Sequence, residues 1–66
     1  MRAGDPLGHE MRAEIFDLLG AVEASSDEIR RQLPSGPTVE TVAYHLAVLE
    51  HAGLIERVGG LWRRRP

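Results

Sequence analysis

The chain has 66 residues, a net charge of −2 and no cysteine, which excludes disulfide bonds and thiolate metal sites. No apolar run approaches the roughly 18 residues of a membrane span and nothing resembles a signal peptide, so we expect a cytoplasmic protein without membrane contact. A chain this short is expected to form a single domain, residues 1–66, with a marginal core, because only about 60% of its unfolded surface is buried on folding.

The first predicted helix spans about residues 7–21. Its apolar side chains recur at the three- and four-residue spacing of a helix face, and Phe16 widens that face. The regular series consists of Met11, Ile15, Leu18, Leu19 and Val22. Gly20 and residues 23–26 mark the end of this helix.

The second predicted helix spans about residues 26–33. Ser25, followed three residues later by Glu28, forms a capping-box pattern ahead of it. Pro34 ends the helix because proline lacks the backbone N–H that another turn needs. Residues 34–37, Pro-Ser-Gly-Pro, have the composition of a turn.

The third predicted helix spans about residues 38–52, and the pattern leaves open whether Pro37 or Thr38 begins it. At about 100° per residue, four residues share one face that we expect to be buried: Val42, His45, Leu46 and Leu49. The opposite face carries Glu40, Tyr44, Ala47 and His51. Gly53 is well placed for a left-handed cap after the helix.

Two short strands over about residues 54–64 complete the pattern, because Gly59-Gly60 is a two-residue hairpin signal. This turn pairs Val58 with Leu61, Arg57 with Trp62 and Glu56 with Arg63. The last two pairs are favourable, one as a cation over an aromatic ring and one as opposite charges. The predicted fold is mainly α with a small β-hairpin, a three-helix winged helix-turn-helix with a two-stranded wing.

Residues 38–55 resemble the recognition helix and the entry to the wing of ArsR-type winged-helix repressors. The family pattern is Thr-Val-Ser-x-His-Leu, then x-x-Leu-x-x-Ala-Gly-Leu-Val, and it matches Thr41, Val42, His45, Leu46, Leu49, Ala52, Gly53 and Leu54. Asp5-Pro6-Leu7 with residues 12–19 is similar to the opening helix of that family. The resemblance implies a third helix in the DNA major groove and a wing along the backbone. The cysteines with which some members sense metals are missing from this chain.

The helix expected to read bases carries no positive charge, since no Lys or Arg occurs from Gly36 to Glu56. Glutamate accepts a hydrogen bond from cytosine N4, threonine bonds a base or a phosphate, and alanine contacts the thymine methyl group. The candidate base-contacting residues are Thr38, Glu40, Thr41, Tyr44 and Ala47.

Phosphate attraction is expected from arginines outside the third helix. Residues 1–56 carry four arginines and ten acids, a charge of −6, whereas residues 57–66 carry four arginines and no acid, a charge of +4. The candidate phosphate contacts are Arg30, Arg31, Arg57, Arg63, Arg64 and Arg65. Four to six such contacts predict a salt slope of only about −4 to −5, so one copy is expected to bind weakly, with a homodimer or a larger protein partner adding affinity.

These patterns favour a small sequence-specific transcriptional regulator that binds double-stranded DNA. The alternative is a winged helix used for protein contact, as an accessory or anti-repressor protein, because an acidic third helix suits a basic partner. No catalytic constellation converges, so neither an enzyme nor a cofactor is expected, and the histidines are not expected to bind a metal. Trp62 is open to two interpretations, packing against a helix or stacking on a base.

Overall fold

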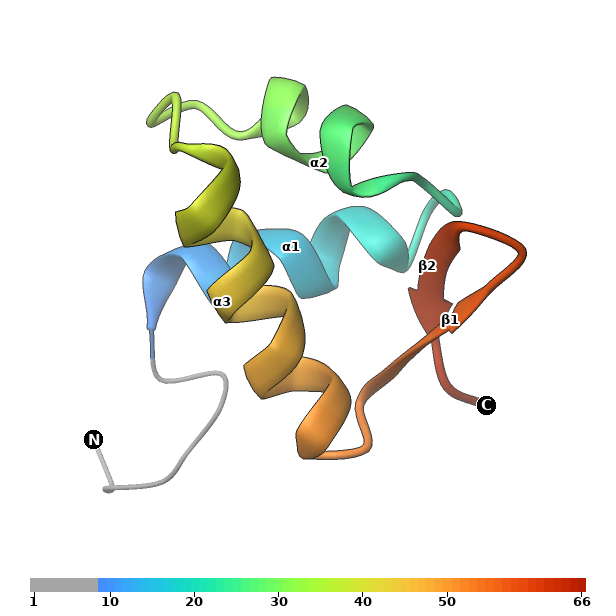
Figure 1. Ribbon diagram of the computed structural model, residues 1–66. Helices are drawn as coiled ribbons and strands as arrows, with labels where there is room; N and C mark the ends of the chain where they lie inside the picture. The colour runs from blue at the N-terminus through green and yellow to red at the C-terminus, as the bar shows by residue number, and fades with distance from the viewer. Residues whose placement is uncertain (1–8) are drawn as a thin grey trace.

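The computed structural model describes residues 9–66. Its elements are α1 (Glu10–Leu19), α2 (Ser26–Gln32), α3 (Val39–His51), β1 (Ile55–Val58) and β2 (Leu61–Arg64). Figure 1 shows α3 crossing α1, with α2 packed beside both and the antiparallel hairpin at the C-terminal end. The predicted mainly helical winged helix-turn-helix with a two-stranded wing is confirmed. Within the described residues, no helix is both long and apolar enough to cross a lipid bilayer.

The first helix is shorter than its apolar pattern. The predicted start at Leu7 and the Asp5-Pro6-Leu7 segment lie outside the described residues. His9 has an extended backbone, and its Nδ1 accepts a hydrogen bond from the Met11 N–H at 3.2 Å, so α1 begins at Glu10. At the other end α1 stops at Leu19, and residues 20–21 form a turn.

Capping side chains set the start of the other two helices. Ser25 Oγ accepts from the Glu28 N–H at 3.1 Å, and the Glu28 carboxylate accepts from the Ser25 N–H at 2.9 Å, which confirms the capping box. Leu33 is extended, since a residue before proline avoids the helical region, and α2 therefore ends at Gln32. Thr38 is the N-terminal cap of α3, so the helix begins after Thr38 and not at Pro37.

The hairpin has the register that the glycine pair predicts. Val58 lies opposite Leu61, Arg57 opposite Trp62 and Glu56 opposite Arg63. Gly59 and Gly60 have φ of 60° and 83°, values that side-chain-bearing residues rarely adopt and that a primed two-residue turn requires.

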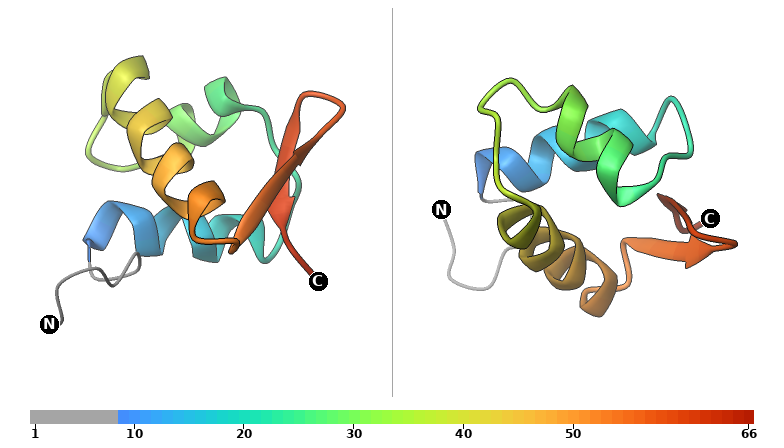
Figure 2. Two further views of the ribbon diagram at one scale, coloured as in Figure 1. Left: turned by 60° about the horizontal axis from the view of Figure 1, so that its bottom comes forward. Right: turned by 45° about the horizontal axis from the view of Figure 1, so that its top comes forward.

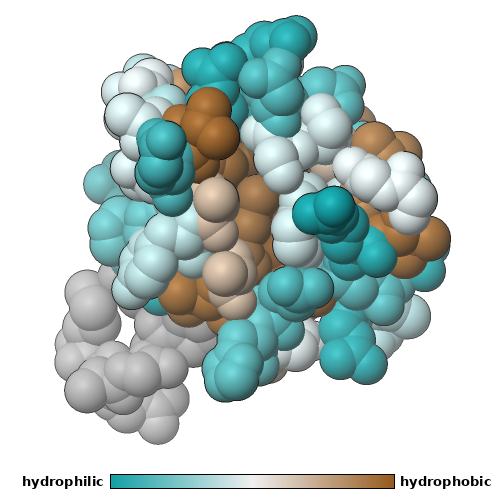
Figure 3. All heavy atoms as spheres, in the orientation of Figure 1, coloured by the Kyte–Doolittle hydropathy of each residue, from teal (hydrophilic) through white to brown (hydrophobic). Residues whose placement is uncertain are grey.

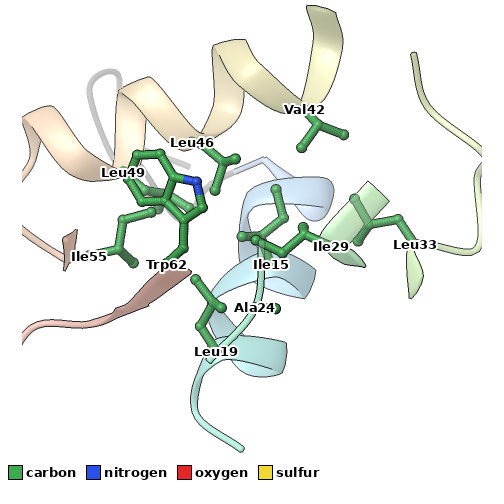
Figure 4. Close-up of a cluster of buried hydrophobic side chains, with 10 residues drawn as sticks. All are labelled: Ile15, Leu19, Ala24, Ile29, Leu33, Val42, Leu46, Leu49, Ile55 and Trp62. Carbon is green, nitrogen blue, oxygen red and sulfur yellow. The ribbon is translucent and has the colours of Figure 1, made fainter. Parts of the chain in front are cut away.

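The hydrophobic core lies where the three helices and the hairpin meet (Figure 4). Its members are Ile15, Leu19, Ala24, Ile29, Leu33, Val42, Leu46, Leu49, Ile55 and Trp62. Complete burial of a side chain such as Leu49 contributes about 1.5–3 kcal/mol. Because all the apolar residues on one face of α3 are used in this core, the opposite face of α3 must point outward.

The wing is joined to the helical body by a short backbone bridge that the sequence pattern did not predict. The Trp62 N–H donates to the Ala24 carbonyl at 2.7 Å, and the Ala24 N–H donates to the Trp62 carbonyl at 3.2 Å. In Figure 2 the hairpin accordingly lies beside the connection between α1 and α2. The indole of Trp62 is buried, and its Nε1–H donates to Ser26 Oγ at 2.9 Å. Of the two interpretations of Trp62, the structure therefore supports packing within the protein and not stacking on a base.

Candidate nucleic-acid interface

The outer face of α3 is exposed as its helical periodicity predicts. Glu40, Tyr44, Ala47 and His51 are all exposed, and Tyr44 leaves 63% of its surface to solvent. The opposite face, which includes His45, is buried against the core. The structure therefore brings three of the five predicted base-contacting residues onto one open surface, namely Glu40, Tyr44 and Ala47.

The two predicted threonine contacts lie at the N-terminal end of α3 and have structural partners. Thr38 Oγ1 accepts from the Thr41 N–H at 3.2 Å, and the two hydroxyl oxygens lie 2.9 Å apart. The Thr38 hydroxyl thus satisfies one of the backbone N–H groups that have no partner within the helix. Both hydroxyls keep a capacity for one further hydrogen bond, because each offers a donor and two lone pairs.

Two grooves flank this face of α3, and they bring in residues that the sequence interpretation missed. Val39 and Ala43 line a groove against α2, and Ala43, Ala47 and Glu50 line another against the wing. Val39 and Ala43 lie at the border between the buried and exposed faces, where helical periodicity alone does not assign a side. Because α2 lies beside this part of α3, Val39 and Ala43 line an open groove between the two helices.

Arg63 and Arg65 of the wing are held near acidic side chains. Arg63 Nε donates to Glu56 at 2.7 Å, and its guanidinium lies 3.9 Å from Glu23. Arg65 lies 4.0 Å from the same Glu56 carboxylate. The Glu56–Arg63 pair was predicted from the hairpin register, whereas the contacts to Glu23 and Arg65 were not.

Arg64 is the most firmly held of the wing arginines. Its Nε donates to the Phe16 carbonyl oxygen at 2.7 Å, and its guanidinium lies 3.8 Å from the centre of the Phe16 ring. Asp17 is 3.7 Å away. This arginine connects β2 to the last turn of α1, so its side chain has a clear structural role.

Arg57 differs from the other three arginines of the wing. Within residues 9–66 no ion pair joins it to a carboxylate, and its guanidinium lies 5.8 Å from the centre of the Trp62 ring. It lines the groove between α3 and the wing, together with Glu50 of α3. The three carboxylates beside the wing, Glu23, Glu56 and Asp17, offset three of the four arginine charges. The local net charge is therefore +1, whereas residues 57–66 alone carry +4.

Comparison with known protein families adds an independent observation to this geometry. A family model described as a helix-turn-helix domain matches residues 7–58, more than three quarters of the chain. The chain belongs to the helix-turn-helix domain family. No curated protein and no solved structure matches it. The closer resemblance to ArsR-type repressors stays a prediction.

Helices α2 and α3 are the helix-turn-helix pair, and α2 carries the remaining two candidate arginines. Arg30 donates to Asp27 at 3.0 Å, and Arg31 pairs with the other oxygen of the same carboxylate. The hydrogen bond from Arg30 and the charge of Arg31 lower the pKa of Asp27. Arg31 leaves 67% of its side chain exposed, so it remains accessible to a phosphate.

Behind the helix-turn-helix face, a histidine pair joins α3 to the start of α1. The His9 and His45 rings have centroids 4.4 Å apart, and His45 Nδ1 is buried without a hydrogen-bond partner. Burial lowers the pKa of His45, and nearby His9 and Arg12 lower it further. Among residues 9–66 no three His, Asp or Glu side chains are grouped as metal ligands. The contact between the two rings packs α3 against the start of α1.

Proposed function

We propose that this helix-turn-helix protein is a small sequence-specific transcriptional regulator that binds double-stranded DNA. The observation that carries the proposal is the open outer face of α3, bordered by α2 on one side and by Arg57 of the wing on the other. A helix held on a core with one face free is the element that helix-turn-helix proteins place in the major groove. Family membership supports the same assignment.

In this proposal α3 contacts base edges and the arginines contact phosphates. Glu40, Tyr44 and Ala47 face the bases, with Thr38 and Thr41 at the leading end of α3. Arg57 has no carboxylate partner to give up before it contacts the DNA backbone. We propose phosphate contacts for the other candidates as well, namely Arg30, Arg31, Arg63, Arg64 and Arg65. Exposed ion pairs contribute only about 0–1 kcal/mol, so Arg31, Arg63 and Arg65 can exchange carboxylates for phosphates at small cost.

The small net charge of the interface limits how tightly one copy binds. Phosphate neutralisation supplies most of the sequence-independent affinity for DNA, and here it depends on a few arginines. We propose that a second copy on a repeated site, or a larger protein partner, adds the missing affinity, and that the protein represses transcription, as its resemblance to ArsR-type regulators implies.

A second candidate function is supported by the charge distribution. Three of the four wing arginines lie beside carboxylates, and α3 exposes Glu40 and Glu50 but carries no Lys or Arg. The outer face also exposes the ring of Tyr44 next to Val48 and Ala47. An acidic helix with an apolar centre suits a basic protein surface, so the alternative role is that of an accessory or anti-repressor protein.

Salt-dependent DNA binding separates these two functions. We would titrate the full chain into a mixed-sequence duplex at several salt concentrations, with wild type and the double variant Arg57→Ala, Arg65→Ala. DNA binding predicts a negative slope of log affinity against log salt that becomes about two units less steep in the double variant. The control is Arg57→Lys with Arg65→Lys, which keeps both charges and the slope. Absence of binding at low salt, or a slope unchanged by the alanine variant, would favour the protein-contact function.

A further inference from the structure

The outer face of α3 has an unusual set of chemical groups for a base-reading helix. Its thirteen residues, Val39–His51, include no Arg, Lys, Asn or Gln. Arginine and lysine are the side chains that read guanine O6 and N7, and asparagine and glutamine are those that read adenine N6 and N7. This helix therefore lacks the usual means of recognising a purine.

What the face offers instead is a line of apolar groups. Val39, Ala43 and Ala47 follow one another at four-residue intervals, all three are exposed, and they line the two grooves beside α3. Figure 3 shows an apolar strip over α3, in the hollow between α3 and its neighbours, with hydrophilic atoms on both sides. The methyl group of thymine is the apolar feature that a base pair presents in the major groove.

The spacing of this line suits adjacent base pairs. Four helical residues rise by about 6 Å, and base pairs along one strand are about 3.4 Å apart. Successive members of the apolar line therefore reach roughly every second base pair. Short side chains at Ala43 and Ala47 also allow the helix axis to approach the base edges closely.

One carboxylate stands beside the line. Glu40 is exposed in the first turn of α3, and no ion pair holds it among residues 9–66. An ionised carboxylate only accepts hydrogen bonds, so it attracts the cytosine N4 amino group and repels guanine O6 and N7. Its negative charge is favourable at the N-terminal end of the helix.

We propose that α3 selects a pyrimidine-rich strand, with cytosine opposite Glu40 and thymine opposite Ala43 and Ala47. This specificity rests on the proposed function, because it concerns the same DNA interface. Recognition then depends on methyl contact and on one carboxylate, and guanine is excluded from the contacted strand beneath Glu40. Arg57 and the exposed arginines supply affinity for the backbone without altering this preference.

Selection from a random duplex pool tests the proposal with the full chain. The retained duplexes should carry cytosine followed within a few base pairs by thymines. Replacing each contacted thymine by uracil removes only the methyl group and should weaken binding about fourfold per site, the value expected for one buried carbon. Glu40→Gln should shift the preferred base at its position from cytosine to adenine by about tenfold. Glu10→Gln on α1 removes an equal charge away from the interface and should leave the preference unchanged.

The outcomes separate the inference from the function on which it rests. Retained duplexes without base preference, or rich in guanine on the contacted strand, overturn the inference while leaving DNA binding in place. Uracil duplexes that bind as well as thymine duplexes, or equal behaviour of Glu40→Gln and Glu10→Gln, do the same. If no duplex is retained at low salt, the proposed function fails and the specificity fails with it.

Discussion

The Arg64 guanidinium stacks 3.8 Å from the centre of the Phe16 ring while its Nε donates to the Phe16 carbonyl oxygen at 2.7 Å. The last turn of α1 contains no basic residue of its own. Arg64 supplies a cation from β2 to the negative end of the α1 dipole and a second donor to the Phe16 carbonyl. The contact therefore fixes the wing relative to the helices, and with it the position of Arg57 beside α3.

The first prediction concerns this contact. Arg64→Ala should lower the free energy of unfolding by about 1–2 kcal/mol, because a charge-assisted hydrogen bond and a cation–π contact are both lost. Urea denaturation measures the change. A loss below about 0.3 kcal/mol would contradict the structural role of Arg64.

Gly20 provides a matched control for the same contact. A Cβ at Gly20 would lie 2.6 Å from Arg64 Cζ, although the backbone, with φ −74°, accepts alanine. Gly20→Ala should therefore give no gain in wild type, because it displaces Arg64. In the Arg64→Ala background it should stabilise by about 0.4–1 kcal/mol, as glycine replacements at compatible positions do. Equal effects in both backgrounds would show that the two residues are not coupled.

The second prediction concerns the hydrogen bond from Trp62 Nε1 to Ser26 Oγ. Ser26→Ala should cost about 1 kcal/mol in wild type, because the buried indole N–H loses its partner. In the Trp62→Phe background the same change should cost close to nothing. Thermal unfolding of the four proteins measures the coupling, and Ser35→Ala in the turn before α3 is the control. If Ser26→Ala costs the same free energy of unfolding with Trp62 and with Phe at this position, the hydrogen bond does not contribute to stability.

The third prediction concerns pH. Burial lowers the pKa of His45 in the folded protein, whereas the unfolded chain keeps an ordinary value of about 6.5. Below that value the unfolded state binds more protons, so the free energy of unfolding should fall as pH decreases from 7.5 to 5.5. His9, which caps α1, and Arg12 of α1 face His45, and Tyr44 is its neighbour on α3.

Denaturation midpoints across this pH range measure the effect. The slope contributed by one group is at most about 1.4 kcal/mol per pH unit. His45→Gln should remove most of that slope, and His51→Gln, on the exposed face of α3, should not. Stability that is constant from pH 7.5 to 5.5, or a slope retained in His45→Gln, would argue against this origin.

Local patterns predicted much of the fold, because the forces that set these features act between neighbouring residues. The capping box at Ser25 and Glu28, the buried face of α3 and the hairpin register all follow from spacing of a few residues. The contacts that orient the wing were not predictable in this way. Arg64 meets Phe16, and Trp62 meets Ala24 and Ser26, across long stretches of chain, and only the packed arrangement brings them together.

The candidate site shows the same division. The outward position of Glu40, Tyr44 and Ala47 followed from helical periodicity, but the roles of the arginines did not follow from their number. Arg64 is engaged by Phe16 and Arg63 by Glu56, while Arg57 is left facing the groove. Sequence counting treats these side chains as equivalent, whereas the surrounding carboxylates and carbonyls make them different.

Mapping of backbone amide NMR signals during titration with a short duplex tests the central claim most directly. We predict that the largest shifts occur at Glu40, Ala43 and Ala47 on α3 and at Arg57 on the wing. Glu10, on α1 and away from this interface, should show none. Shifts confined to α1, or an unchanged spectrum at low salt with excess duplex, would contradict a DNA interface formed by α3 and the wing.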